Sequence, residues 1–199
     1  MKFYQEMTLL PDSEISPYFL WTKVYTQLHI AIADVKNTHG VHAIGVSFPN
    51  YRYSNDNGKI SGTLGRKLRV FAQSEDELVK LDLSKQLERL TDYVHIISIK
   101  PVPIDKITGY AQYYRVMPKM PLEQRIAHQA KRHGVSLEEA TAHLKNYQTP
   151  PTSEPFIRLT SHSTGHEFSL YIGKTITDST GDGHFGTYGL SRSAGVPEF

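Results

Sequence analysis

The segment Lys67-Leu68-Arg69-Val70-Phe71-Ala72-Gln73-Ser74-Glu75-Asp76-Glu77 decides the fold class, because a predicted strand leads directly into a predicted helix within it. The strand covers residues 67–73. The next four residues form a capping-box pattern, in which Ser74 and Glu77 bond to the first free N–H groups of a helix. We expect this helix to continue to about residue 90, and a further strand to cover residues 94–100.

The residues before this segment are predicted to form the first half of the same domain, again with two strands and a helix. Residues 3–10 and 43–48 are predicted strands, and Ser16-Pro17 suits the cap and first turn of a helix between them. This helix runs to about residue 36, with apolar residues at helical spacing: Trp21, Val24, Leu28, Ile32 and Val35. Residues 51–65, polar and glycine-bearing, are expected to form a mobile loop. The order β-α-β-β-α-β is that of a ferredoxin-like unit, an antiparallel sheet with both helices on one face.

We therefore predict an α+β protein with a ferredoxin-like domain over residues 1–100 and a second domain over residues 101–199. Residues 101–109 are expected to be a linker, because they carry two prolines and a glycine. In the second domain we expect an extended segment (110–117), a helix (122–132) and a short helix capped at Ser136. Residues 156–172 alternate apolar and polar residues on both sides of a Ser-Thr-Gly break, which is typical of a β-hairpin.

Positive charge is concentrated in one part of the chain. The net charge of +2 over 199 residues is too small to indicate a polyanion partner, but residues 110–133 hold five cations and one acid, Glu123. On the predicted helix one face carries four polar side chains, which we call the basic ridge: Arg125, His128, Gln129 and Arg132. The ridge either faces a ligand or is an ordinary solvated helix face. Residues 67–73 lack the stacking signature of an RNA-recognition domain, which disfavours a generic single-strand binder.

Composition excludes several other classes of protein. The chain contains no cysteine, so it has neither disulfides nor thiolate metal sites. The first residues lack the apolar region of a signal peptide, and no apolar run is long enough to cross a bilayer. We therefore expect a soluble, cytoplasmic protein.

Histidines near the hairpin suggest a metal site that the spacing argues against. His162 and His166 are four residues apart, and Asp182 and His184 follow later. A spacing of four brings two ligands together on a helix, whereas this segment is predicted to be a hairpin. The glycine-rich residues 181–186 follow no phosphate-binding-loop pattern. We expect no metal and no cofactor.

His29 and the hairpin loop are the candidates for chemistry. His29 lies at the edge of the apolar stripe of the first helix, where an imidazole is partly exposed and can exchange a proton near neutral pH. It is either a general acid-base group or a structural histidine. Ser161 and Ser163 are two residues apart on an extended segment, so they point to the same face and can contact one ligand together.

These blocks together resemble a known family. Leu28-His29, Ile44-Gly45-Val46-Ser47-Phe48-Pro49, the hairpin loop, Thr187-Tyr188-Gly189-Leu190-Ser191 and Val196-Pro197-Glu198-Phe199 resemble the CRISPR repeat-processing endoribonuclease of type I-F systems, in order and approximate spacing. The resemblance implies that His29 transfers the proton of a ribose 2′-hydroxyl, that Ser161 positions this hydroxyl and that Tyr188 orients the site by hydrogen bonding. The implied products are a 2′,3′-cyclic phosphate and a 5′-hydroxyl, formed without a metal.

The resemblance also implies an RNA-hairpin partner for the second domain. The basic ridge and Lys119 would contact the stem, Arg115 would read a guanine near its base, and Met117 replaces the glutamine that the family uses beside it. Ser163 would contact RNA near the cut. His162 is expected to be a loop residue that touches RNA. Phe168 would stack beneath the last base pair, or else is a core aromatic of the hairpin. The chain would remain in a type I-F surveillance complex with other subunits; alternatively, it binds the RNA hairpin there without cleaving it.

Overall fold

The protein has a mixed α/β fold, and its computed structural model describes residues 1–56, 59–147, 152–161 and 164–199. Contacts divide it into two compact units: one comprises Met1–Val116 with Glu154–Phe199, and the other comprises Met117–Ser153. The units therefore do not separate at residue 100. Strands from both halves of the sequence share the core of the first unit, because the apolar side chains of β2 pack against those of β11.

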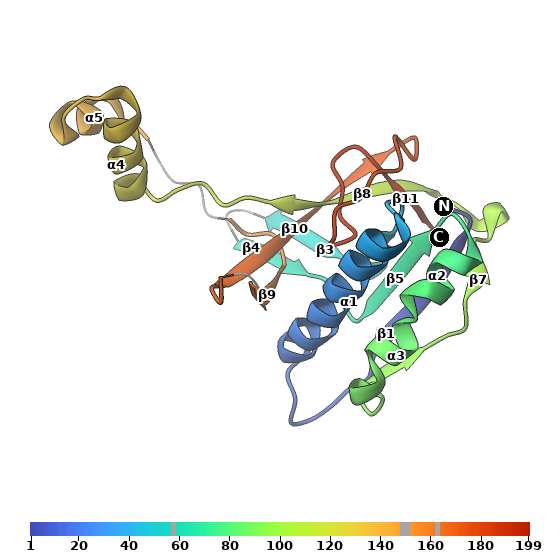
Figure 1. Ribbon diagram of the computed structural model, residues 1–199. Helices are drawn as coiled ribbons and strands as arrows, with labels where there is room; N and C mark the ends of the chain where they lie inside the picture. Colours follow the sequence, from blue (N-terminus) through green and yellow to red (C-terminus); the bar gives the residue numbers. More distant parts are fainter. Residues whose placement is uncertain (57–58, 148–151, 162–163) are drawn as a thin grey trace. The chain divides into compact units, whose positions relative to one another are not determined.

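The first sheet combines strands from the first hundred residues. Its order is β2 (Gly45–Ser47), β5 (Lys67–Ala72), β1 (Phe3–Leu9) and β6 (Val94–Ile96), and every pair is antiparallel. The predicted strand 94–100 is interrupted, since β7 (Lys100–Pro101) pairs separately with the start of β1. Helices α1, α2 and α3 lie over one face of this sheet (Figure 1).

The long helix α1 (Pro17–His39) begins and ends where the sequence signals predict, to within three residues. Ser16 caps it by accepting a hydrogen bond from the N–H of Tyr18, and Pro17 occupies the first turn. Gly40 ends it in the left-handed conformation with φ 66°. The predicted apolar stripe is buried against the sheet. This burial fixes the rotation of the helix about its axis, and so fixes which side chains lie at the edge of the stripe.

The helix predicted after Ser74 is shorter than expected. Its capping box between Ser74 and Glu77 is confirmed, but α2 (Glu75–Leu81) ends at Asp82, which has φ 43°. The side chain of Asp82 then caps α3 (Leu83–Gln86), and a turn of 3₁₀ helix follows at Glu88–Leu90. Leu81, Leu83 and Leu87 remain buried on both sides of the break, so the apolar spacing resembled one continuous helix.

The predicted mobile loop at residues 51–65 is wrong. It contains β3 (Arg52–Asp56) and β4 (Lys59–Thr63), which pair as an antiparallel ribbon. Two hydrogen bonds fix the base of the ribbon. The indole N–H of Trp21 donates to the carbonyl of Gly65 (3.0 Å), and the hydroxyl of Tyr51 donates to the carbonyl of Ile172 (3.1 Å).

The second sheet contains the predicted hairpin. Its order is β11 (Val196–Glu198), β8 (Gly109–Val116), β10 (Glu167–Thr177) and β9 (Phe156–Thr160), again antiparallel throughout. The hairpin β9–β10 and the extended segment β8 are thus confirmed. The predicted linker is instead tied to β1, because Val102 is buried and its N–H donates to the carbonyl of Lys2 (2.8 Å).

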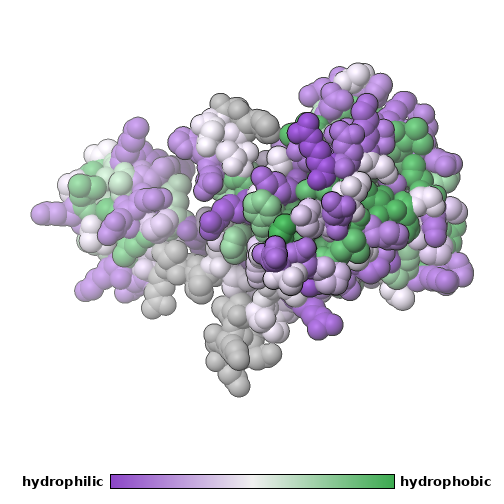
Figure 2. Space-filling view, turned by 90° about the horizontal axis from the view of Figure 1, so that it is seen from below, coloured by the Kyte–Doolittle hydropathy of each residue, from purple (hydrophilic) through white to green (hydrophobic). Residues whose placement is uncertain are grey.

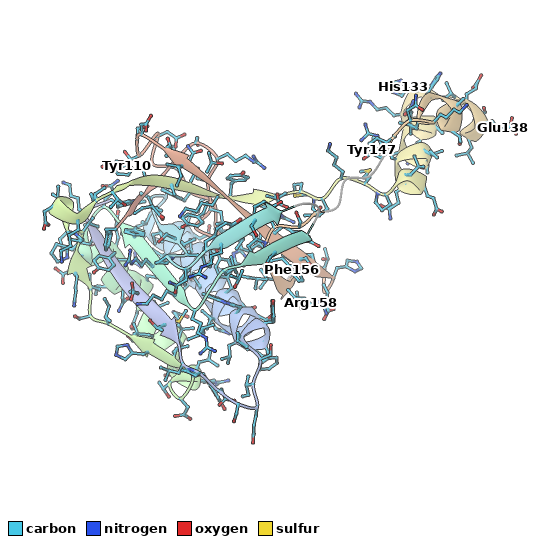
Figure 3. The ribbon with its side chains drawn as sticks, turned by 180° about the vertical axis from the view of Figure 1, so that it is seen from behind. Tyr110, His133, Glu138, Tyr147, Phe156 and Arg158 are labelled. Atoms are coloured by element: carbon cyan, nitrogen blue, oxygen red, sulfur yellow. The ribbon has the colours of Figure 1, made fainter. Side chains whose placement is uncertain are left out.

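The second unit is a pair of short helices with almost no core. Helices α4 (Leu122–His133) and α5 (Leu137–His143) pack on each other, and Ala140 is the one buried residue in the described part of this unit. The predicted cap at Ser136 is confirmed by a capping box with Glu139. His133 ends α4, Glu138 lies in the first turn of α5, and Tyr147 follows α5 (Figure 3).

The outer surface of the molecule is mixed in character. Hydrophobic side chains are scattered among hydrophilic ones on the face seen in Figure 2. Within the described residues, every helix is too short or too polar to cross a bilayer.

A buried ion pair in the first sheet makes stability depend on pH. Glu6 accepts hydrogen bonds from Lys67 and from Nε of Arg69 (2.8 Å), and its side chain is only 11% exposed. Burial alone would raise the pKa of Glu6, but these hydrogen bonds outweigh it and hold the pKa below its ordinary value. The resulting stabilisation is complete above the ordinary glutamate pKa of about 4.3 and is lost as the pH falls through the lower folded-state pKa.

We expect Glu6→Gln to lower the free energy of unfolding at pH 7 by about 1–3 kcal/mol, because two cations lose a charged acceptor. The gap between variant and wild type should shrink as the pH falls from about 5 to 3, where wild-type Glu6 also becomes neutral. Urea unfolding across this range measures it, with the exposed Glu88→Gln as a control. A gap that is constant with pH would show that Glu6 contributes through packing and not through its charge.

Candidate active site

His29 is held by a hydrogen bond that selects the tautomer of its neutral ring. It lies partly buried on α1, and its Nδ1 is 3.0 Å from the carbonyl oxygen of Thr187. Because a carbonyl oxygen only accepts, Nδ1 carries the hydrogen. In the neutral ring the hydrogen is then absent from Nε2, which is left as a proton acceptor. The predicted position at the edge of the apolar stripe is confirmed, since Leu28 beside it is fully buried.

The loop opposite His29 is fixed by a second contact from the same helix. Tyr25 lies one turn before His29, and its hydroxyl donates to the carbonyl of Tyr188 (2.8 Å). Burial, and secondarily the nearby Tyr188, raises the pKa of Tyr25, so its hydroxyl remains a donor. Tyr25 and His29, four residues apart on α1, thus donate hydrogen bonds to the carbonyls of two consecutive residues, Tyr188 and Thr187. Sequence reasoning did not single out Tyr25 or Thr187, although the spacing of Tyr25 and His29 indicates a shared face.

Gly189 completes this loop because no other residue fits there. It has φ 67°, its carbonyl accepts from the N–H of Val46 (3.0 Å), and its N–H donates to the carbonyl of Gly186 (2.8 Å). A Cβ at this position would lie 2.5 Å from Cγ1 of Val46. The blocks at residues 44–49 and 187–191, far apart in sequence, therefore pack directly on each other.

We expect Gly189→Ala to destabilise the protein by about 2–4 kcal/mol, the sum of a left-handed alanine and a clash with Val46. Gly183→Ala is the matched control. Gly183 also has positive φ (71°), but a Cβ there meets nothing within 4 Å, so the cost should be about 1–2 kcal/mol. Equal losses in denaturant unfolding would mean that the contact with Val46 relaxes freely.

A chain of ring contacts joins four of the predicted site residues. Tyr188 stacks on His29, with centroids 4.0 Å apart and planes 13° apart. Phe168 meets Tyr188 edge-on at 6.5 Å, and the guanidinium of Arg115 lies 5.2 Å from the ring centre of Phe168. Burial raises the pKa of Tyr188, and Arg115 partly opposes this, so Tyr188 is neutral at pH 7. Its described contact with His29 is stacking, while the orienting hydrogen bond is the one that His29 donates to the backbone carbonyl of Thr187.

Ser161 belongs to the same face of the hairpin as Phe168. Its N–H donates to the carbonyl of His166 (2.9 Å), which continues the ladder beyond Thr160. Leu159 is directly opposite Phe168, and Ser161 is two residues further along, so all three share one face. Phe168 itself is partly buried and packs against the core cluster. His162 and Ser163 lie outside the described residues.

The residues of the basic ridge line one depression on the surface of the second unit. Arg125, His128, Gln129 and Arg132 line a hollow of about 360 Å³ together with Met120 and His133. The apolar Leu122 and Ile126 line a separate groove between α4 and α5, so the predicted division of the helix into two sides is found. The guanidinium of Arg125 rests 4.3 Å from the ring centre of Tyr147. Met117 and Lys119 are exposed in the segment before α4.

The described residues contain no cluster of three or more histidine or acidic side chains arranged to hold a metal ion. The contacts around His29 instead join one imidazole, the rings of Tyr188 and Phe168 and the guanidinium of Arg115. Such groups can transfer a proton, stack on a base and bind a phosphate. RNA presents hydroxyl groups, bases and phosphates that suit these three roles.

Comparison with known proteins identifies the family of the chain. The model of the CRISPR-associated protein (Cas_Csy4) family matches residues 4–199. The chain belongs to this family. The resemblance to the type I-F CRISPR repeat-processing endoribonucleases is thereby confirmed. The Cas_Csy4 match covers both compact units, so the helical pair α4–α5 is part of the family and not an unrelated addition.

Relatives of full length support the same assignment. The CRISPR-associated endonuclease Cas6/Csy4 of Pseudomonas aeruginosa (strain UCBPP-PA14) is 34% identical over 200 residues, covering 100% of both chains. That of Escherichia coli (strain UTI89 / UPEC) is 29% identical over 201 residues, again covering 100% of both. A solved CRISPR endoribonuclease Cse3 bound to a 19-nucleotide RNA is 14% identical, covers 98% of this chain and 100% of its own, and has a TM-score of 0.38.

Proposed function

We propose that this chain is a metal-independent endoribonuclease that cleaves CRISPR repeat RNA hairpins. The observation that carries the proposal is the hydrogen bond from Nδ1 of His29 to the carbonyl of Thr187, because it leaves Nε2 free as a base. Membership of the Cas_Csy4 family and the two relatives named as CRISPR-associated endonucleases support the reaction type. The first sheet, with its order β2-β5-β1-β6, is proposed to be a ferredoxin-like unit.

The proposed reaction uses a nucleophile that the substrate supplies. The 2′-oxygen before the scissile phosphate attacks the phosphorus, Nε2 of His29 takes up its proton, and the bond to the 5′-oxygen breaks. The 5′-oxygen takes a proton from water and His29 later returns its proton to the solvent, so the products are a 2′,3′-cyclic phosphate and a 5′-hydroxyl. Because the 2′-oxygen is already next to the phosphorus, positioning supplies much of the acceleration and no metal-bound water is needed.

The remaining site residues are proposed to hold the RNA. Ser161 positions the 2′-hydroxyl, and Tyr188 keeps the imidazole in one orientation by stacking on it. Phe168 stacks beneath the last base pair, while Arg115 beside it reads a base edge near the foot of the stem. Ser163 and His162 are proposed to contact RNA near the cut.

A division of labour follows from these roles. We propose that residues 1–100 supply the catalytic histidine and that residues 101–199 recognise the hairpin. The basic ridge, Lys119 and Met117 contact the stem mainly through charge and shape, since side chains cannot read the narrow groove of A-form RNA. After cleavage the protein stays on the mature guide RNA within a type I-F surveillance complex.

The test is to incubate the purified chain with the repeat RNA of its own locus in EDTA. We expect cleavage at one site, with a 2′,3′-cyclic phosphate on the upstream product. Binding without cleavage would support a non-cleaving hairpin-binding subunit. Cleavage that requires added Mg²⁺, or that leaves a 3′-hydroxyl, would contradict the proposed chemistry.

A further inference from the structure

Arg192 is an exposed arginine whose guanidinium is nevertheless held in place. Its central carbon lies 4.3 Å from the ring centre of Tyr114, and Nη2 donates to the carbonyl of Arg115 at 3.0 Å. One contact fixes the plane of the group and the other fixes its rotation within that plane. Neither contact neutralises its charge, and within the described residues Nη2 is the guanidinium nitrogen with a hydrogen-bond partner, out of five N–H donors in the group.

The ring beneath Arg192 is itself fixed. Tyr114 is directly opposite Gly173 on β10, and a Cβ on Gly173 would lie 2.7 Å from that ring. The ring therefore occupies the space that a side chain at residue 173 would fill. The hydroxyl of Thr175 bonds to that of Tyr114 (3.3 Å), and the guanidinium rests on this support.

The backbone that carries Arg192 is also constrained. The N–H of Ser191 donates to the carbonyl of Tyr113 (2.8 Å), which attaches the loop to the middle of β8. The hydroxyl of Ser191 accepts from the N–H groups of Ser193 (3.2 Å) and Ala194 (3.0 Å). An exposed side chain so constrained loses little conformational entropy when it binds a ligand.

The charge of Arg192 distinguishes it from a structural arginine. Arg69 also stacks on a ring, that of Phe199 at 4.1 Å, but Glu6 neutralises it. Among the described residues no carboxylate lies within ion-pair distance of Arg192 or of Arg115. Two unneutralised arginines therefore occupy the end of β8, linked by the hydrogen bond between them.

We propose that Arg192 binds a backbone phosphate of the RNA hairpin next to the base pair that Arg115 reads. This inference rests on the proposed function and adds a contact to it. A stacked guanidinium presents the edge of its plane to solvent, and this edge matches the oxygens of a phosphate. A phosphate contact carries no sequence information, so it should act equally on every stem.

The test uses the full chain and a repeat hairpin with a 2′-deoxy nucleotide at the cut, which binds but cannot react. We expect Arg192→Ala to weaken binding about three- to tenfold and to make the plot of log affinity against log salt shallower by about 0.7–0.9. A hairpin with an inverted basal pair should lose affinity by the same factor. Arg192→Lys keeps the charge and should keep the wild-type slope.

Controls separate this proposal from the proposed nuclease function on which it rests. Arg89→Ala removes another exposed cation and should change neither affinity nor slope, and melting curves check that each variant is folded. Wild-type affinity and slope in Arg192→Ala would overturn the phosphate contact while leaving the nuclease intact. A loss confined to the native basal pair would overturn it too, because Arg192 would then act through Arg115. If the wild type itself does not bind the hairpin, both proposals fail.

Discussion

Replacing His29 with alanine is expected to slow single-turnover cleavage of the repeat hairpin by about a hundredfold to ten-thousandfold, the usual range for loss of a general base. RNA affinity should stay close to that of the wild type, since the imidazole makes no proposed phosphate contact. The hydrogen bond to Thr187 and the stack on Tyr188 orient the ring, but they do not hold the RNA. Rapid mixing with excess enzyme, together with filter binding, separates the two quantities.

His39→Ala is the matched control, because it removes an imidazole from the exposed end of the same helix. Its cleavage rate should equal that of the wild type. Cleavage by His29→Ala at the wild-type rate would remove this residue from the chemistry. Equal losses of affinity and rate would make His29 a structural residue that supports the loop at 187–190.

The fold was predictable wherever local signals agree with long-range packing. The caps at Ser16, Ser74 and Ser136 and the hairpin at 156–172 all follow from short patterns of residues. The β3–β4 ribbon was missed because residues 51–65 lack apolar alternation, although the Asn-Gly pair at 57–58 is a strong hairpin signal. The break at Asp82 could not be predicted, since a left-handed aspartate depends on the packing of the leucines around it.

The contacts within the candidate site could not be predicted from the sequence. The family resemblance implied that Tyr188 orients the site by hydrogen bonding, yet its described contact with His29 is ring stacking. The imidazole is oriented by the hydrogen bond that its Nδ1 donates to a backbone carbonyl 158 positions away. No side-chain pattern marks a carbonyl, so only the packing of residues 44–49 under Gly189 reveals it.

The basic ridge should give the largest effect on binding. Replacing Arg125 and Arg132 by alanine is expected to weaken binding of the non-cleavable hairpin about ten- to hundredfold and to make the salt plot shallower by about 1.4–1.8, for two lost phosphate contacts. The loss should be the same for stems of any sequence, because the ridge is proposed to contact phosphates, which carry no sequence information. Filter binding across a salt series measures both quantities.

Two further variants test whether the position of the charge matters. Arg125 also rests on Tyr147, so alanine there can loosen the small second unit as well as remove a contact. Arg125→Lys with Arg132→Lys retains both charges and should retain the salt slope even if affinity falls. Lys131→Ala with Lys145→Ala removes the same net charge from residues outside the ridge and should change the slope much less. If all three double variants bind alike, the ridge is a solvated helix face, and the stem binds elsewhere on the chain.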